Sequence, residues 1–321
     1  MIPDSPQQNN KRHIPQLSIK LNFADFWGGF ENCNWFLSFL PNYFDIEVCD
    51  RPDFLIYSDF GDEHLRYGCT RIYFTGENRR PNFSHCDYAF TFDYLEDPRQ
   101  YRLPLYRLYF PQETLTARHD VDAIFAQERK FCNMVVSNPK ASERLAFFHA
   151  LSRYQHIDSG GRVRNNVGGP VPDKRAFIRK YKFTLAIESS SHPGYTTEKL
   201  VEPWVEGSIP IYWGNPRVAE EFNPGSFINL HDFQTWNDAV DFIRKVDQDP
   251  DLYRQYLEAP LFPGNRMPAS LTDDAIADAF ANVFRHPASR PTIRKSWQQS
   301  VHALKRIKRR LVGANDRRNT E

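Results

Sequence analysis

The stretch from residue 183 to residue 214 constrains the fold more than any other part of the chain. It begins with an apolar run, residues 183–187, that is typical of a buried parallel strand. Three serines, a proline and a glycine follow and indicate a turn. Thr196 or Thr197 can cap a helix that ends at Gly207, and residues 209–213 form a second apolar run. The stretch therefore predicts a strand–helix–strand unit.

This unit also predicts where a ligand binds. Its loop and its helix N-terminus follow the carboxyl end of a strand, which is where open α/β sheets bind ligands. The N–H groups and the partial positive charge of a helix N-terminus favour a phosphate. Lys199 lies in the first turn of this helix, where a cation is unfavourable unless an anion is close by.

Composition bounds the class of protein. With 321 residues, 40% of them apolar, the chain is long enough for two domains with substantial cores. The net charge of +1 gives no general attraction to nucleic acid. The five cysteines are odd in number and include no Cys-x-x-Cys pair, so we expect reduced, buried thiols in a cytoplasmic protein. The polar first ten residues predict no signal peptide, and no apolar run approaches the ~18 residues of a membrane span.

Two series of strands and helices follow one another along the chain, with a break near residue 130. We predict strands at 17–23, 44–49, 54–57, 71–75, 88–92, 132–136, 183–187, 209–213 and 227–230, and helices at 33–40, 142–151, 173–181, 196–207, 235–247, 250–257 and 272–284. This alternation predicts an α/β protein with two Rossmann-like domains facing across a cleft. The expected boundaries are 1–130 for the first domain and 131–290 for the second.

Residues 291–321 differ from the rest of the chain. Trp297, Val301, Leu304, Ile307 and Leu311 recur at steps of three and four, and basic residues surround them. Such a basic amphipathic helix can lie on an anionic membrane surface. The alternative is a solvated helix that packs back on the protein.

Several ordered motifs resemble those of the α1,3/α1,4-fucosyltransferases, and most closely those of bacterial members. The motifs are Thr75-Gly76-Glu77-Asn78, residues 160–165 (Gly-Gly-Arg-Val-Arg-Asn), Glu188, Tyr195-Thr196-Thr197-Glu198-Lys199, residues 209–214 (Ile-Pro-Ile-Tyr-Trp-Gly), Phe222-Asn223-Pro224 and His231-Asp232-Phe233. The resemblance covers roughly residues 17–259 and implies the two-domain GT-B architecture. It also implies an acceptor-binding first domain with a catalytic base and a second domain that binds GDP-fucose.

The implied activity is an inverting transfer of L-fucose from GDP-β-L-fucose to O3 or O4 of GlcNAc in an N-acetyllactosamine-type glycan. The expected acceptor is a surface polysaccharide or a lipopolysaccharide precursor, met in the cytoplasm or at the inner face of the cell membrane. An inverting displacement needs a carboxylate that takes the acceptor proton on one face of the sugar. It needs positive charge for the leaving diphosphate on the other.

Glu77 is the candidate base. It comes just after a predicted strand, and Gly76 lets a substrate approach the backbone closely. The alternative is a solvated loop glutamate, and the resemblance favours the catalytic role.

Arg164 and Lys199 are the candidate phosphate cations. Arginine offers a bidentate fork to phosphate oxygens, and lysine supplies a point charge. Arg162 competes with Arg164 for this role, and the resemblance favours Arg164. Asn165 is expected to join the same phosphate loop, whereas the alternative for Lys199 is an ordinary surface lysine.

Three further residues complete the expected donor site. Glu198 can accept hydrogen bonds from ribose hydroxyls, or it can simply complement the helix dipole. Tyr195 can cover the sugar or the base, or pack the loop. Glu188 matches a family glutamate expected to contact fucose or to order the loop. Ser189 stands where the family usually has asparagine, which leaves the loop geometry and the choice of donor open.

On the acceptor side, Trp27 and Glu31 belong to an aromatic turn that resembles one in bacterial members. Trp27 can stack on a sugar ring or pack in the core. No His, Cys or Asp spacing suggests a metal site, so we expect neither a divalent metal nor another cofactor to be required.

Two other functions stay open. The same fold could use another GDP-sugar or an unusual acceptor, as Ser189 allows. The chain could also be an inactive glycan-binding or scaffold protein, although intact Glu77, Arg164, Glu198 and Lys199 argue against this.

Overall fold

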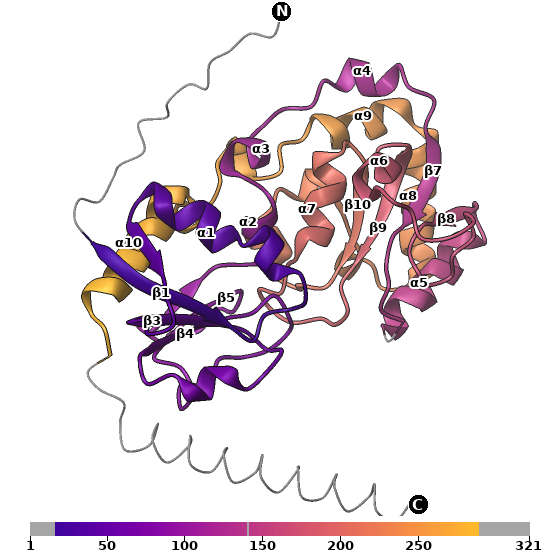
Figure 1. Ribbon diagram of the computed structural model, residues 1–321. Helices are drawn as coiled ribbons and strands as arrows, with labels where there is room; N and C mark the ends of the chain where they lie inside the picture. The colour runs from indigo at the N-terminus through magenta and orange to yellow at the C-terminus, as the bar shows by residue number, and fades with distance from the viewer. Residues whose placement is uncertain (1–16, 140, 289–321) are drawn as a thin grey trace, which may run out of the picture. The chain divides into compact units, whose positions relative to one another are not determined.

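The computed structural model describes residues 17–139 and 141–288, which form two compact units, each built around a sheet (Figure 1). The first unit holds residues 17–91, 96–101 and 273–288, and the second holds Phe92–Leu95 and Arg102–Thr272. The two Rossmann-like units that the sequence predicts are therefore present. Contacts within the structure divide the chain at other positions than the expected boundaries of 130 and 290. The predicted tail helix, 291–321, lies outside the described residues.

The sheet of the first unit has the strand order β2-β1-β3-β4-β5-β6. Its strands are β1 (Ser18–Ala24), β2 (Asp45–Val48), β3 (Phe54–Tyr57), β4 (Thr70–Phe74), β5 (Tyr88–Thr91) and β6 (Gln100–Arg102). The pairs from β2 to β5 are all parallel, so the loops after β1, β3 and β4 lie side by side at one edge of the sheet. Its helices are η1 (Phe30–Cys33), α1 (Trp35–Phe39), η2 (Leu40–Asn42), η3 (Glu63–Arg66) and α10 (Asp273–Arg285).

The last described helix, α10, belongs to the first unit although it follows the second in sequence. Phe280 stacks on Phe90 with ring centroids 4.1 Å apart, and Phe284 packs edge-on against Phe44 and Phe54. The sequence predicts this helix from its periodicity. Periodicity does not say which sheet an apolar stripe will cover, so it does not predict that α10 belongs to the first unit.

The sheet of the second unit has the order β11-β10-β9-β7-β8, again with parallel pairs. Its strands are β7 (Lys130–Met134), β8 (Ile157–Ser159), β9 (Tyr181–Ile187), β10 (Ile209–Trp213) and β11 (Ile228–Asn229). Its α-helices are α2 (Tyr106–Tyr109), α3 (Gln112–Leu115), α4 (Val121–Phe125), α5 (Ser142–Ser152), α6 (Lys174–Ile178), α7 (Glu198–Val205), α8 (Trp236–Gln248) and α9 (Pro250–Glu258). Short 3₁₀ turns are η4 (Val218–Glu220), η5 (Pro224–Ser226), η6 (Leu230–Asp232), η7 (Pro263–Asn265) and η8 (Ala269–Leu271).

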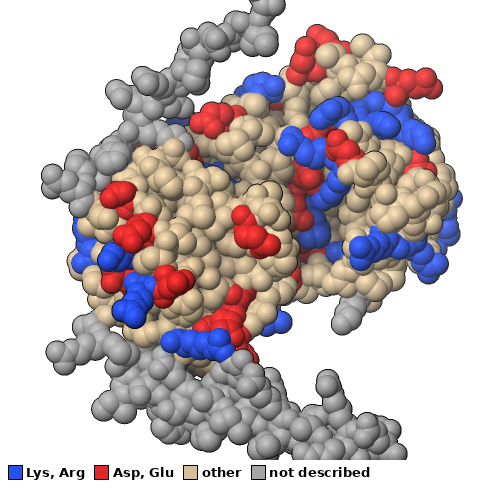
Figure 2. All heavy atoms as spheres, viewed as in Figure 1, with Lys and Arg blue, Asp and Glu red and all other residues tan. Residues whose placement is uncertain are grey.

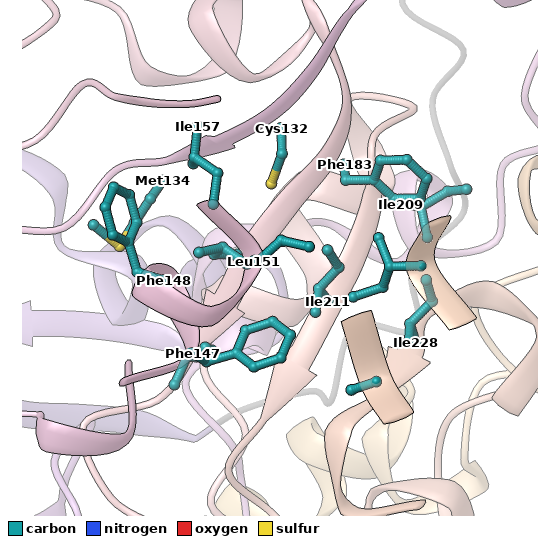
Figure 3. Close-up of a cluster of buried hydrophobic side chains, with 14 of the residues drawn as sticks. Cys132, Met134, Phe147, Phe148, Leu151, Ile157, Phe183, Ile209, Ile211 and Ile228 are labelled. Carbon is teal, nitrogen blue, oxygen red and sulfur yellow. The ribbon is translucent and has the colours of Figure 1, made fainter. Parts of the chain in front are cut away.

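Helices cover both faces of this second sheet. On one face, Phe147, Phe148 and Leu151 of α5 share a buried cluster with apolar side chains of all five strands (Figure 3). On the other, Leu200 and Trp204 of α7 pack with Ala186 and Tyr212 of the central strands. Because both faces are covered, side chains on both faces of β9 and β10 are buried, rather than those of one face alone.

Most predicted elements are confirmed, and the differences have simple causes. The predicted strand–helix–strand unit is β9–α7–β10, with Thr197 as the N-cap of α7. The expected helix at 33–40 is shorter, because it tightens into the 3₁₀ turn η2 with a proline in its first turn. The strands β6 and β8 were not predicted; each has only three residues, too few for a periodic signal.

The cysteine prediction is correct in part. All five cysteines are free, as expected, but only Cys86 and Cys132 are buried, whereas Cys33 is exposed. Within the described residues, no helix is long and apolar enough to cross a membrane.

Candidate active-site residues at the carboxyl edges of the two sheets

Three acidic residues follow three neighbouring strands of the first unit. Asp25 comes directly after β1, Asp59 two residues after β3, and Glu77 three residues after β4. Because these strands are adjacent and parallel, all three acids lie at the same edge of the sheet.

The carboxylate of Asp25 is hydrogen-bonded to a neighbouring loop. Its carboxylate accepts hydrogen bonds from the backbone N–H groups of Glu63 and His64, both at 2.9 Å, and lies 2.6 Å from Nδ1 of His64. Burial disfavours the charged form, but the hydrogen bonds from His64 and Glu63 outweigh it and lower the pKa of Asp25.

The carboxylate of Asp59 is likewise hydrogen-bonded to neighbouring side chains, whereas that of Glu77 has no such partner among the described residues. The Asp59 carboxylate accepts hydrogen bonds from the hydroxyls of Tyr73, at 2.7 Å, and Thr75. The side chain of Glu77 is exposed, and no hydrogen bond or ion pair to its carboxylate occurs among the described residues. Of the three acids, Glu77 alone is available to a substrate.

Aromatic side chains lie at this same edge. Trp27, after β1, is half-buried and packs edge-on against Phe60, which follows β3, with ring centroids 6.3 Å apart. Phe60 is 52% exposed, so about half of its surface is open to solvent. Glu31 is an exposed first-turn residue of η1, after the left-handed Gly29. Phe60 has no motif around it, so the sequence did not single it out.

In the second unit, Glu188 stands at the end of β9. Its side chain is fully buried, and Oε1 accepts hydrogen bonds from the N–H of Thr197, at 2.8 Å, and from its hydroxyl, at 2.7 Å. Gly214 makes this position possible, because a Cβ there would lie 2.5 Å from Cγ of Glu188. The carboxylate of Glu188 therefore holds Thr197, the N-cap residue of α7.

Lys199 projects back toward Glu188. Its Nζ lies 3.1 Å from Oε2 of Glu188 and 3.5 Å from Oε1 of Glu198. Burial alone would lower the pKa of Lys199, but the two carboxylates outweigh it and raise that pKa above its usual range. Burial also opposes the charged form of Glu198, whose pKa is nonetheless lowered by Lys199 and Lys174. In this structure the anions that Lys199 requires are the carboxylates of Glu188 and Glu198.

Arg144 is a buried cation that the sequence analysis missed. It is 2% exposed on α5, and its Nε and Nη2 donate to the carbonyl of Ile187, at 3.0 and 2.6 Å. Burial lowers the pKa of Arg144, and the nearby charge of Glu188 opposes that effect. Arg144 thus fixes the end of β9 from which Glu188 projects. No motif in the sequence marks it, since it is one arginine in an amphipathic helix.

Arg164 and Asn165 lie in the loop after β8, at the same edge as Glu188 but two strands away. Arg164 is exposed and has a left-handed φ of 51°, a strained conformation that is enriched at functional sites. Its Nη2 lies 3.3 Å from Nε2 of His149. Asn165 closes the loop, because its amide donates to the carbonyl of Gly161 at 2.7 Å and accepts from the N–H of Gly169 at 2.8 Å.

Tyr195 is 3% exposed, in the loop between β9 and α7. Its ring packs edge-on against Phe92 at 5.0 Å, and its carbonyl accepts from the hydroxyl of Tyr212 at 3.1 Å. The nearby Gly194 has a φ of 84°, and a Cβ there would lie 2.5 Å from the carbonyl O of Phe92. In this structure Tyr195 therefore packs the loop, the alternative that its sequence left open.

Basic side chains are frequent on the surface of the second unit (Figure 2). Figure 2 shows Lys and Arg side chains gathered over its visible face, around α6 and around α5 and β8. Several of them are paired: Arg175 and Arg179 of α6 both contact the buried carboxylate of Glu206.

Among the described residues, no group of three or more His, Cys, Asp or Glu side chains is placed to hold a metal ion.

Comparison with known families accounts for most of the chain. Residues 21–109 match the α-(1,3)-fucosyltransferase FucT N-terminal domain, and residues 125–259 match the C-terminal part of glycosyltransferase family 10, the fucosyltransferases. The chain belongs to this fucosyltransferase family.

Individual proteins to which the chain is similar include named fucosyltransferases. The α-(1,3)-fucosyltransferase FucT of Helicobacter pylori is 36% identical over 60% of this chain and 47% of its own length. Human α-(1,3)-fucosyltransferase 4 is 35% identical over 35% of this chain and 22% of its own length. The similarity thus spans less than half of these relatives.

Solved structures share the fold. A crystal structure of an α1,3-fucosyltransferase with GDP-fucose is 28% identical, covers 88% of this chain and 94% of its own, and gives a TM-score of 0.72. A glycosyltransferase from Rickettsia africae, only 8% identical, still gives a TM-score of 0.54 over 85% of this chain. The predicted GT-B fold is confirmed.

Proposed function

We propose that this member of the family is an inverting α1,3- or α1,4-fucosyltransferase. It transfers L-fucose from GDP-β-L-fucose to a GlcNAc hydroxyl of an N-acetyllactosamine-type glycan. The hydroxyl oxygen attacks the anomeric carbon, the base takes its proton, and GDP leaves from the opposite face.

The availability of Glu77 carries this proposal. At the edge formed by β1, β3 and β4, the carboxylate of Asp25 accepts hydrogen bonds from a neighbouring loop. That of Asp59 accepts from the hydroxyls of Tyr73 and Thr75, and Glu77 is exposed. A general base must reach the proton it abstracts, so a carboxylate facing solvent at a ligand-binding edge meets the requirement.

The donor binds to the second unit in this proposal. Arg164 and Lys199 hold the diphosphate, with Asn165 shaping the loop that carries Arg164. Glu198 accepts from the ribose, Glu188 contacts fucose or orders the loop, and Tyr195 borders the site. Side-chain cations and the start of α7 supply the positive charge, so the transfer needs no divalent metal.

The acceptor binds to the first unit. Trp27 stacks on a sugar ring, Glu31 accepts from sugar hydroxyls, and the exposed face of Phe60 extends the surface that Trp27 begins. The physiological acceptor would be a surface polysaccharide or lipopolysaccharide precursor. The apolar stripe and the basic residues around it in the sequence of 291–321 would hold the enzyme at the cytoplasmic face of an anionic membrane.

Ser189 favours one alternative, the same chemistry with a different GDP-sugar or acceptor. This half-buried serine begins the loop between β9 and α7 and lacks the amide donor of asparagine.

One experiment tests both forms of the proposal. GDP release by the purified protein is measured with GDP-fucose and with GDP-mannose, each with and without N-acetyllactosamine, and the linkage of any product is determined by NMR. We expect acceptor-dependent release with GDP-fucose and an α-linked fucose on GlcNAc. Preference for GDP-mannose would support the alternative, and binding of GDP without transfer to any of a broad set of glycans would contradict both.

A further inference from the structure

The hydroxyl of Thr75 lies between Asp59 and the backbone of Glu77. Its Oγ1 contacts Oδ2 of Asp59 and lies 3.0 Å from the N of Glu77 and 3.2 Å from its carbonyl O. Thr75 is fully buried at the end of β4, and the side chain of Asp59 is only 8% exposed. The loop that carries Glu77 is thus tied to the end of the neighbouring strand, β3.

The direction of these hydrogen bonds follows from counting hydrogens. A hydroxyl has one hydrogen to donate, and a carboxylate only accepts. The shorter contact to the charged acceptor takes that hydrogen, so Thr75 donates to Asp59. Its lone pairs then face the N–H of Glu77, which donates to them. Asp59 therefore orients the hydroxyl that holds Glu77.

Further hydrogen bonds hold the backbone of Glu77 and the turn that contains Asp59. The carbonyl of Glu77 accepts from the N–H of Arg79 at 2.6 Å, so the backbone of Glu77 is bound on both sides. Asp59 also accepts from the hydroxyl of Tyr73 at 2.7 Å. The turn containing Asp59 is itself fixed to β1, because Phe60 N–H donates to the carbonyl of Asp25 at 2.9 Å.

We propose that Asp59 and Thr75 are positioning residues for the catalytic base, acting through the hydroxyl of Thr75 on the backbone of Glu77. This inference rests on the proposed function of Glu77. The side chain of Glu77 has no anchor among the described residues, so its carboxylate is placed by its backbone alone. Small displacements of a reacting group cost large factors in rate, up to about 10²-fold for ~1 Å.

The test compares Thr75→Val, which keeps the shape of the side chain and removes the hydroxyl, with Thr75→Ser, which keeps the hydroxyl. We expect Thr75→Val to lower kcat about tenfold or more, with the KM values for donor and acceptor within about twofold of wild type. Thr75→Ser should restore most of the turnover. Tyr73→Phe is the matched control, because it removes the other hydroxyl on Asp59 and leaves Thr75 and Glu77 joined; its kcat should stay within about threefold.

A double-mutant cycle separates positioning from a merely structural role. In a Glu77→Gln background no base remains to be positioned, so Thr75→Val should lower the residual turnover no further. Full turnover of Thr75→Val in the wild-type background, or the same fold loss in both backgrounds, would overturn the inference. Normal turnover of Glu77→Gln alone would instead overturn the assignment of the base, and this inference with it.

Discussion

Glu188 and Lys199 form an ion pair of 3.1 Å across the start of α7, and the Glu188 side chain is fully buried. The carboxylate of Glu188 accepts from the N–H of Thr197 at the same time, so one side chain holds the N-cap residue of α7 and places the cation. The position of Lys199 therefore depends on a residue eleven positions away at the end of β9.

Glu188→Gln is expected to weaken both donor binding and stability. The amide can still accept from Thr197, but its NH₂ group faces the ammonium of Lys199, which loses a charged partner. Breaking a buried ion pair costs about 3–5 kcal/mol of unfolding free energy, and we expect the lower end, about 3 kcal/mol, because Lys199 is partly exposed. The KM for GDP-fucose should rise about tenfold. Urea unfolding and initial rates measure the two effects.

Glu220→Gln is the matched control, since Glu220 forms an exposed pair with Arg217 in the same unit. It should leave donor KM and stability nearly unchanged. An equal loss of stability in both variants would contradict the special role of the Glu188 pair.

Glu77→Gln is expected to lower kcat ~10²- to 10⁴-fold, because general-base catalysis contributes about this much. The exposed side chain makes no packing contribution to lose, so the unfolding temperature should stay the same. Steady-state rates with GDP-fucose and thermal unfolding check this. Turnover within a few-fold of wild type would remove Glu77 from the mechanism.

Phe60→Ala is expected to raise the acceptor KM severalfold and to leave the donor KM unchanged. Its exposed ring lies against Trp27 and offers an apolar face to a sugar. Leu37→Ala removes a comparably exposed apolar side chain from α1 and is the control. If both variants behave alike, the effect of Phe60 is not specific to the acceptor.

Stability should fall as the pH drops below neutrality, partly through His231. Burial disfavours the imidazolium and lowers the pKa of His231. Between the ordinary pKa, near 6.5, and this lowered value, the unfolded chain binds a proton that the folded chain does not. The stabilisation is therefore present above about pH 6.5 and is lost as the pH falls through the lowered pKa.

His231→Asn should remove this part of the pH dependence. We expect the difference in unfolding midpoint between wild type and the variant to shrink from pH 8 to pH 5.5. A difference that stays constant over this range would contradict a lowered pKa at His231.

Removal of divalent metal is expected to leave turnover unchanged. The described residues contain no cluster of metal ligands, and the proposed diphosphate contacts are Arg164, Lys199 and the start of α7. Rates are measured in excess EDTA and again after Mg²⁺ or Mn²⁺ is restored. A loss in EDTA that the metal reverses would contradict the proposed cation set.

The sequence by itself determined the kind of fold and most of the residues at the two sheet edges. Apolar runs, turn residues and a capping threonine were enough to predict β9–α7–β10, because an apolar run and a helix cap are patterns of neighbouring residues. Family motifs then marked Glu77, Arg164, Glu188 and Lys199 as the candidate base and donor-site residues.

Only the tertiary structure decided what each of these side chains contacts. It paired Lys199 with Glu188, buried Tyr195 against Phe92, and gave α10 to the first unit. It also showed that the carboxylates of Asp25 and Asp59 are hydrogen-bonded within the protein while Glu77 is exposed. Arg144, whose side chain contacts the end of β9, and the exposed ring of Phe60 became visible only in the structure. Such contacts join residues far apart in the chain, and their energies depend on burial and distance, which no local pattern of residues contains.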